Sequence, residues 1–144
     1  MGLDGARLRG CEKSLVDAPE RGGKALHLTV ASKPPEGWMS HAFIHGLHQD
    51  IKTGDKIAVT FWARTLSGGD NGRGLIKLEL GQSENPYTGI INKFFNINQE
   101  WSLHSIDGVA TFDLAADKGR FGFCLGYWQQ VIEIANISVH KTAP

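Results

Sequence analysis

Three segments of the chain place a large aromatic residue beside turn-forming residues instead of inside an apolar run. Trp38 follows Pro-Pro-Glu-Gly, Tyr87 follows Glu-Asn-Pro, and Trp128 follows Leu-Gly-Tyr. Turns and strand ends lie at protein surfaces, so we expect these rings to be partly exposed. A rigid ring with a polar edge suits a ligand that is flat, apolar on its faces and polar around its rim. A pyranose ring fits that description, so the three residues indicate sugar binding.

Three further residues are candidates for the same role. Gln129 follows Trp128 and carries an amide that can hydrogen-bond with sugar hydroxyl groups. Trp62 and Arg64 alternate with apolar residues, so they share the face of a strand that points away from the core. Each of these aromatic residues has a second interpretation, in which the ring packs against its own sheet. Trp101 begins a strand after a tight turn, and we expect it to be structural.

The strands contain few carboxylates that could act in catalysis. Hydrolysis of a glycosidic bond needs two carboxylates roughly 5 to 10 Å apart, one of them protonated. A Glu-x-Asp or Glu-x-Glu pair would provide them on one face of a strand, and the sequence contains neither. Glu79 and Glu133 each stand alone among apolar neighbours, as salt-bridged residues or as acceptors for sugar hydroxyls. With no nucleophile, phosphate-binding or dinucleotide motif either, the sequence predicts a protein that is not an enzyme.

The histidine and cysteine residues do not have the spacing of a metal site. In a strand, His41 and His45 point the same way about 13 Å apart, whereas His48 points the opposite way. Cys11 and Cys124 are too few for a disulfide framework. They are either two buried thiols or one disulfide.

Length and charge exclude several classes of protein. The chain has 144 residues, enough for one full core but too few for two ordinary domains, so we expect residues 1–144 to form a single domain. Lys+Arg 15 and Asp+Glu 15 leave no net charge, which argues against nucleic acid binding. No apolar run approaches the length of about 18 residues that a membrane span needs. Met1-Gly2 lacks a signal-peptide pattern and resembles the start of a domain excised from a larger enzyme.

Alternating apolar residues between glycine-containing turns predict an all-β domain. The pattern is clearest in the segment 56–64, where Ile57, Val59, Phe61 and Ala63 share one face. It recurs in the segments 25–30, 41–48, 75–80, 90–97, 101–111, 121–128 and 131–140. Strands at this spacing predict a β-sandwich jelly roll of two antiparallel sheets.

Several segments resemble, in their order along the chain, carbohydrate-binding modules of families 4, 9 and 22. Gly22-Gly-Lys-Ala-Leu-His-Leu-Thr-Val30 is similar to their G-x-x-A-L-x-V strand, and Lys52-Thr-Gly-Asp-Lys56 to their K-x-G-x-x-Y turn. Val59-Thr-Phe-Trp-Ala-Arg64 resembles their s-F-W-v-K strand. Ile132-Glu-Ile-Ala-Asn-Ile-Ser-Val139 resembles the closing Y-I-D-D-V-S-V strand.

This resemblance implies a galactose-binding-like jelly roll that binds one glycan chain in a cleft. The ligand would be a plant-type polysaccharide, β-1,4-xylan or a β-glucan, held near a tethered xylanase-like glycoside hydrolase. The module would be secreted and monomeric. By position, Trp38 and Tyr87 resemble cleft residues of family 22, while Trp128 and Gln129 fall near the cleft edge.

Two other interpretations of the sequence stay open. One is a structural or interaction β-sandwich that joins domains of a polysaccharide-degrading enzyme without binding sugar. The other is a small polysaccharide lyase or hydrolase of the same fold, which would need a catalytic acid or base in the cleft.

The sequence departs from the family pattern where related modules hold a structural calcium ion. Ala135-Asn136 replaces the closing acid pair, and the N-terminal F-E strand is reduced to Leu3-Asp-Gly5. If calcium is retained, the resemblance implies Asn136 with main-chain oxygens near Gly22 and Lys24, since hard cations take oxygen ligands. Asn136 is therefore the candidate metal ligand.

Overall fold

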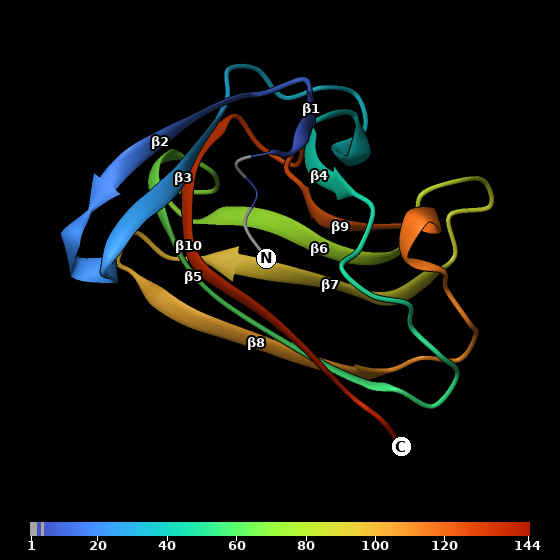
Figure 1. Ribbon diagram of the computed structural model, residues 1–144. Coiled ribbons are helices and arrows are strands. Elements are labelled where there is room, and N and C mark those ends of the chain that lie inside the picture. Colours follow the sequence, from blue (N-terminus) through green and yellow to red (C-terminus); the bar gives the residue numbers. More distant parts are fainter. Residues whose placement is uncertain (1–2, 4) are drawn as a thin grey trace.

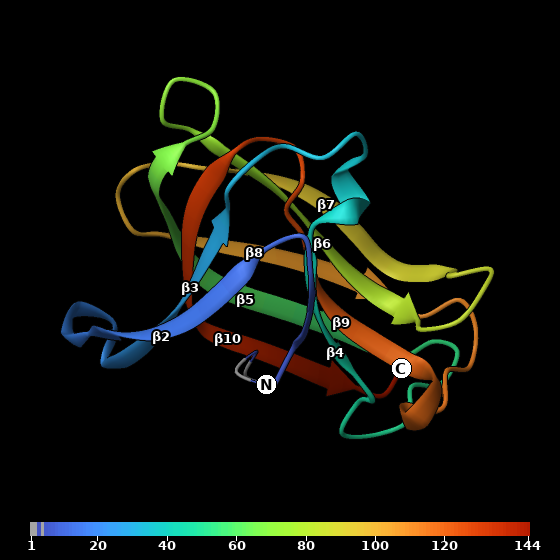
Figure 2. The same ribbon diagram turned by 90° about the horizontal axis from the view of Figure 1, so that it is seen from above.

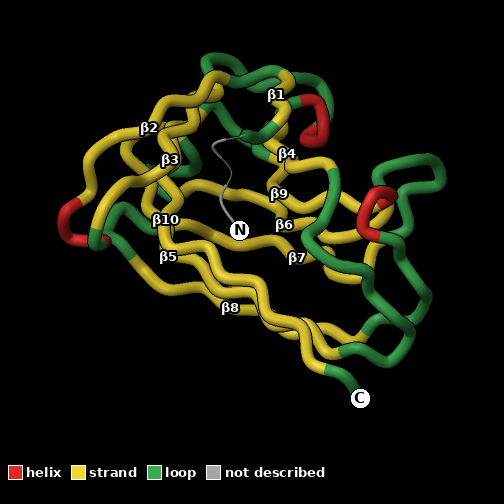
Figure 3. Tube along the Cα trace, viewed as in Figure 1, coloured by secondary structure: helices red, strands yellow, loops and turns green. Residues whose placement is uncertain are grey.

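The computed structural model describes residue 3 and residues 5–144, so Met1, Gly2 and Asp4 lie outside the described residues. The expectations for the Met1-Gly2 start and for Asp4 therefore stay predictions. The described strands are β1 (Arg7–Arg9), β2 (Glu12–Ala18), β3 (Gly23–Val30), β4 (His41–His45), β5 (Lys56–Gly68), β6 (Gly74–Gln82), β7 (Gly89–Ile97), β8 (Ser102–Val109), β9 (Gly119–Cys124) and β10 (Gln130–Thr142). Short 3-10 helices, red in Figure 3, occupy connections: η1 (Pro19–Arg21), η2 (Gly37–Met39) and η3 (Ala116–Lys118).

Within the described residues, the strands form two antiparallel sheets of five strands each. Sheet A has the order β1-β4-β9-β6-β7, and sheet B has the order β2-β3-β10-β5-β8. Figure 1 shows the sheets as two layers, and Figure 2 shows the same arrangement from above. The predicted all-β sandwich jelly roll of two antiparallel sheets is confirmed.

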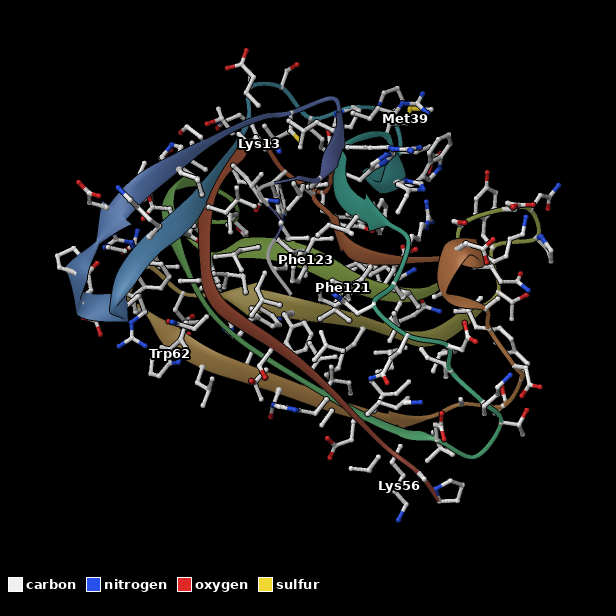
Figure 4. The ribbon with its side chains drawn as sticks, viewed as in Figure 1. Lys13, Met39, Lys56, Trp62, Phe121 and Phe123 are labelled. Carbon is white, nitrogen blue, oxygen red and sulfur yellow. The ribbon has the colours of Figure 1, made fainter. Side chains whose placement is uncertain are left out.

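The core fills the space between the two sheets. Ile57, Val59, Phe61 and Ala63 of β5 are all buried, as their alternation predicts. Phe61 meets Phe123 of β9 edge-on, with ring centroids 5.1 Å apart, so the contact joins sheet B to sheet A. Figure 4 shows Phe121 and Phe123 between the layers and Trp62 outside them. Burial of each such aromatic ring contributes about 2 to 3 kcal/mol of hydrophobic stabilisation.

All eight strands predicted from alternation are present, but the two N-terminal strands were missed. β2 is mostly exposed along its length because it is an edge strand of sheet B, so it lacks a clean apolar period. β1 has only the three residues Arg7–Arg9. Each of the two strands pairs with an inner neighbour, and Leu8 of β1 and Val16 of β2 are partly buried against apolar clusters. No described helix is long and apolar enough to cross a lipid bilayer.

Candidate functional site

The outward face of sheet A collects polar and aromatic side chains from all five of its strands. Residues directly opposite each other in antiparallel strands point to the same side of a sheet. The observed pairing therefore sets two rows across sheet A, in strand order: Arg9, His41, Cys124, Lys77 and Phe94, then Arg7, Phe43, Gly122, Glu79 and Asn92. Beside them, Arg120 of β9 pairs with His45 of β4.

A cleft of about 470 Å³ lies over these rows. Its lining combines the sheet residues Arg9, His41, Phe43, Glu79, Arg120 and Cys124 with the loop residues Trp38 and Tyr87. Gly122 lets the backbones of β9 and β4 approach closely beneath the cleft, because a Cβ at this position would lie 2.0 Å from the carbonyl oxygen of Ala42. Two of the three predicted loop aromatics thus line one cleft.

Trp38 belongs to η2, which connects β3 to β4. Its ring is 51% exposed, while its carbonyl oxygen lies 2.8 Å from Nδ1 of His41. The preceding Gly37 lies against Tyr127, where any Cβ would come 2.1 Å from the ring. These contacts fix the loop so that the Trp38 ring faces the cleft, and the Arg9 guanidinium lies 5.0 Å from the ring centroid.

Tyr87 belongs to the loop between β6 and β7. It is 54% exposed, and its backbone adopts the left-handed region with φ of 58°, which is uncommon for a residue with a side chain. The backbone N–H of Tyr87 donates to the Glu84 carbonyl at 2.7 Å and closes the turn. The Arg120 guanidinium lies 5.0 Å from the Tyr87 ring centroid and 4.0 Å from that of Phe43.

Glu79 is the acid on the cleft floor, and several groups contact it. Arg120 Nη2 lies 3.3 Å from its Oε1, and Lys77 Nζ lies 3.8 Å from its Oε2. The Cys124 thiol donates to Oε2 at 3.2 Å. Burial first, and then the Glu79 charge, raises the pKa of Cys124 to about 12, so the thiol keeps its proton. Burial also raises the pKa of Tyr127.

Trp128 and Gln129 lie outside this cleft lining. Trp128 is 37% exposed, with the Lys33 ammonium 5.5 Å from its ring centroid. The side chain of Gln129 is exposed, and its carbonyl oxygen accepts from Gly69 N–H at 2.9 Å. The next residue, Gln130, is buried and hydrogen-bonds the backbone of Leu75 and Leu125.

Trp62 and Arg64 lie on the outward face of sheet B, so the structure separates them from the cleft. The Arg21 guanidinium covers the Trp62 ring at 3.7 Å from its centroid. Arg64 lies over Trp101 at 4.8 Å, and the Trp101 indole N–H donates to Glu20 at 2.9 Å. Trp101 is therefore a structural residue of this outer face.

Asn136 lies at a β-bulge of β10, where the pairing with β5 shifts register and φ is 54°. Its amide Nδ2 donates to the Arg21 carbonyl at 3.0 Å. Among the described residues, no group of three or more His, Cys, Asp or Glu side chains could hold a metal ion. The calcium site predicted from the resemblance would use an amide oxygen and main-chain oxygens, and it stays a prediction. Cys11 and Cys124 are free thiols.

Five residues of this site were not predicted from the sequence: Arg9, His41, Phe43, Arg120 and Cys124. Arg9 belongs to the short β1, and Arg120 precedes the segment 121–128 that was predicted as a strand. Their common position follows from the order of strands in sheet A, which alternation alone does not reveal. The one local signal was His41 directly after the Trp38 segment.

Several solved structures have a fold similar to that of this chain. No protein-family model and no curated protein matches the sequence. Solved structures do match. One described as "CBM4 structure and function" is 19% identical, with 98% of this chain and 81% of that chain covered and a TM-score of 0.70. The N-terminal cellulose-binding domain of Cellulomonas fimi β-1,4-glucanase C is 14% identical, with 99% and 92% covered and a TM-score of 0.74.

A third match is part of a larger enzyme. The Clostridium thermocellum endo-1,4-β-D-xylanase 10B structure contains CBM22-1 and GH10 modules with xylohexaose. It is 11% identical, and the match covers 99% of this chain and 27% of that chain with a TM-score of 0.67. At these identities the likeness concerns the fold. This chain therefore has the two-sheet jelly-roll fold of these carbohydrate-binding modules.

Proposed function

We propose that the chain is a non-catalytic carbohydrate-binding module and that a glycan chain binds in the cleft on sheet A. The observation that carries this proposal is that Trp38 and Tyr87, from different loops, line the same cleft. Both rings are about half exposed, so each offers apolar surface to a ligand. The like fold of known carbohydrate-binding modules supports the proposal.

The cleft offers the two kinds of contact that sugars use. The aromatic rings give apolar surface for the axial C–H groups of a pyranose. Arg9 and Arg120 of the lining give hydrogen-bond donors for the hydroxyl groups, and Glu79 gives acceptor oxygens. Asn92, at the end of the second row, adds an amide beside the cleft. The rows cross all strands of the sheet, so an extended chain can lie along them and contact several sugar units.

The chemistry of the cleft supports binding without catalysis. Glu79 is the only carboxylate in the cleft lining of the described residues. Glycoside hydrolysis commonly requires two carboxylates on opposite sides of the bond. The Glu79 carboxylate is also shared between two cations, since Arg120 Nη2 lies 3.3 Å from Oε1 and Lys77 Nζ lies 3.8 Å from Oε2.

The ligand in this proposal is β-1,4-xylan or a β-glucan, and the module is secreted and acts as a monomer beside a tethered glycoside hydrolase. The cellulose-binding domain and the xylohexaose complex among the similar structures support this choice. A weakly binding module raises the concentration of substrate near the attached catalytic site. The alternative of a structural sandwich without sugar binding is decided by a binding measurement.

The test is affinity electrophoresis and calorimetry of the protein with xylan, mixed-linkage β-glucan and soluble cellulose derivatives. We expect binding to at least one of them and a loss of about tenfold or more in affinity for Trp38→Ala. Trp128→Ala serves as the matched control, because its ring is also exposed but lies outside the cleft lining. Absence of binding to every polysaccharide, or equal affinity of the Trp38 variant and the wild type, would contradict the proposal.

A further inference from the structure

Positive charge is concentrated on the cleft face of a chain that has no net charge overall. Among the described residues of the two rows, together with Arg120 beside them, there are four basic residues, Arg7, Arg9, Lys77 and Arg120. The same set contains one acidic residue, Glu79. A neutral glycan needs no such excess. Focused positive charge in a concave site attracts anions.

The two arginines in the cleft lining, Arg9 and Arg120, have guanidinium N–H donors that are available to a ligand. In the described part of the chain, no carboxylate forms an ion pair with Arg9, which is exposed beside Trp38. Arg120 contacts Glu79 through Nη2 alone, whereas a guanidinium has five N–H donors. Each arginine lies 5.0 Å from the centroid of one cleft aromatic, Arg9 by Trp38 and Arg120 by Tyr87. A sugar that contacts either ring brings its substituents close to a guanidinium.

The acidic residues Glu79 and Glu84 near the cleft do not neutralise this excess of positive charge. The carboxylate of Glu79 is shared among Arg120, Lys77 and the Cys124 thiol. Glu84, in the Tyr87 loop, pairs with Lys118 at 3.0 Å. The pKa of His45 is lowered, by burial first and then by the charges of Arg7 and Arg120, which is the response expected in a positive field.

We propose that the glycan bound in this cleft carries anionic groups, carboxylate or sulfate, that pair with Arg9 and Arg120. This inference rests on the proposed function, since it names the class of glycan that the same site takes. Guanidinium forms two parallel hydrogen bonds with carboxylate and with sulfate-like oxygens, which neutral hydroxyls cannot match. The aromatic rings hold the sugar rings, and the arginines select the charged substituents.

The test uses polysaccharides that share a backbone and differ in charge. Calorimetry compares a neutral xylan, the same xylan bearing uronic acid groups and the same xylan bearing sulfate groups, with a matching β-glucan series. We expect at least one anionic member to bind about tenfold or more tightly than its neutral parent, because charge-assisted hydrogen bonds are stronger than neutral ones. The carboxylate and sulfate members identify which group the cleft prefers.

Variants separate recognition from general attraction to charge. Arg9→Gln should lose about tenfold in affinity for the anionic glycan while affinity for the neutral parent changes little. Arg9 is chosen over Arg120 because Arg120 also contacts Glu79. Arg73→Gln is the control, since Arg73 is exposed and lines a different hollow with Asn98 and Glu100. Dextran sulfate, a polyanion with a different backbone, should bind weakly and without dependence on Trp38.

The results of these experiments distinguish failure of this inference from failure of the proposed function. Equal binding of neutral and anionic members would overturn this inference and leave the proposed function standing. A preference for the anionic glycan that Arg9→Gln leaves intact would overturn the assignment to this cleft. Dextran sulfate binding as tightly as the anionic xylan would also overturn it, because charge alone would then explain the affinity. No binding to any member would remove both proposals.

Discussion

Arg64 donates two hydrogen bonds to one carboxylate oxygen of Glu133, from Nε at 2.9 Å and from Nη2 at 2.8 Å. The other oxygen of Glu133 lies 2.7 Å from Nδ1 of His27. These three residues connect β5, β10 and β3 on the outward face of sheet B. Arg64, which the sequence analysis considered for ligand binding, therefore has a structural partner.

Glu133→Ala should destabilise the protein by about 2 kcal/mol or more, measured as the free energy of unfolding in urea. Glu133 is only 4% exposed, and its removal leaves Arg64 and His27 without their carboxylate. Asp17→Asn is the control, because the Asp17–Lys24 pair is exposed on both sides and should contribute little. Equal unfolding midpoints for Glu133→Ala and the wild type would contradict a stabilising role.

Substitutions on the two sheets should differ in their effect on polysaccharide binding. Tyr87→Ala removes a cleft ring and should weaken binding about tenfold. Trp62→Ala should leave binding unchanged, because Trp62 is on the outward face of sheet B beneath Arg21. Calorimetry with the same polysaccharide measures both variants. Weaker binding in the Trp62 variant, with its fold intact by circular dichroism, would place a binding site on sheet B.

The sequence predicted eight of the ten described strands and two of the cleft aromatics, because both leave local signals. Alternation identifies a strand, and a ring among turn residues such as Trp38 identifies an exposed aromatic. Alternation also separates the two faces of a strand, but it does not tell which sheet carries a cleft. For that reason Trp62 was a candidate as well as Tyr87, although Trp62 lies on the outward face of sheet B and Tyr87 lines the cleft on sheet A.

The rest of the cleft depends on which strands become neighbours. Arg9, Arg120 and Glu79 come from β1, β9 and β6, and only the order of strands in sheet A brings them together. The single residue Glu79 was correctly seen as an isolated acid. Its contact with Arg120 could not be inferred without the register of β6 against β9, whereas Lys77 lies two residues away on the same face of β6.

Stability should fall as pH is lowered from 7.5 to 5.5, partly through His104. Burial lowers the pKa of His104 below its ordinary value of 6.5, and its ring stacks on Phe61 at 5.2 Å. The unfolded state then binds the proton more readily, so the stability present above the ordinary pKa is lost as pH falls. His45, whose pKa is also lowered, acts in the same direction.

Urea unfolding of the wild type and of His104→Gln at both pH values measures this contribution. The difference between the two midpoints should be smaller in the variant. The exposed His48→Gln is the control and should keep the wild-type pH dependence. An unchanged pH dependence in His104→Gln would show that the histidine does not contribute.

Calcium should have no effect on the melting temperature. Proteins hold calcium tightly with several carboxylates, and no group of three or more His, Cys, Asp or Glu side chains among the described residues could hold a metal ion. A site made of Asn136 and main-chain oxygens alone would bind calcium weakly. Thermal unfolding in excess calcium and in excess EDTA, each after exhaustive dialysis, measures this directly. A rise of several degrees with calcium that Asn136→Ala abolishes would restore the calcium site predicted from the family resemblance.

The rows across sheet A have a consequence for folding as well as for recognition. Apart from β6 and β7, no two adjacent strands of sheet A follow each other in the sequence. The cleft therefore forms only after segments far apart in the sequence have paired in the sheet. A glycan that binds there binds the folded state alone. At a concentration of about 100 times its Kd it would stabilise the domain by about 2.7 kcal/mol through mass action. A rise in the melting temperature on addition of a glycan therefore reports binding, so candidate glycans can be screened by thermal unfolding.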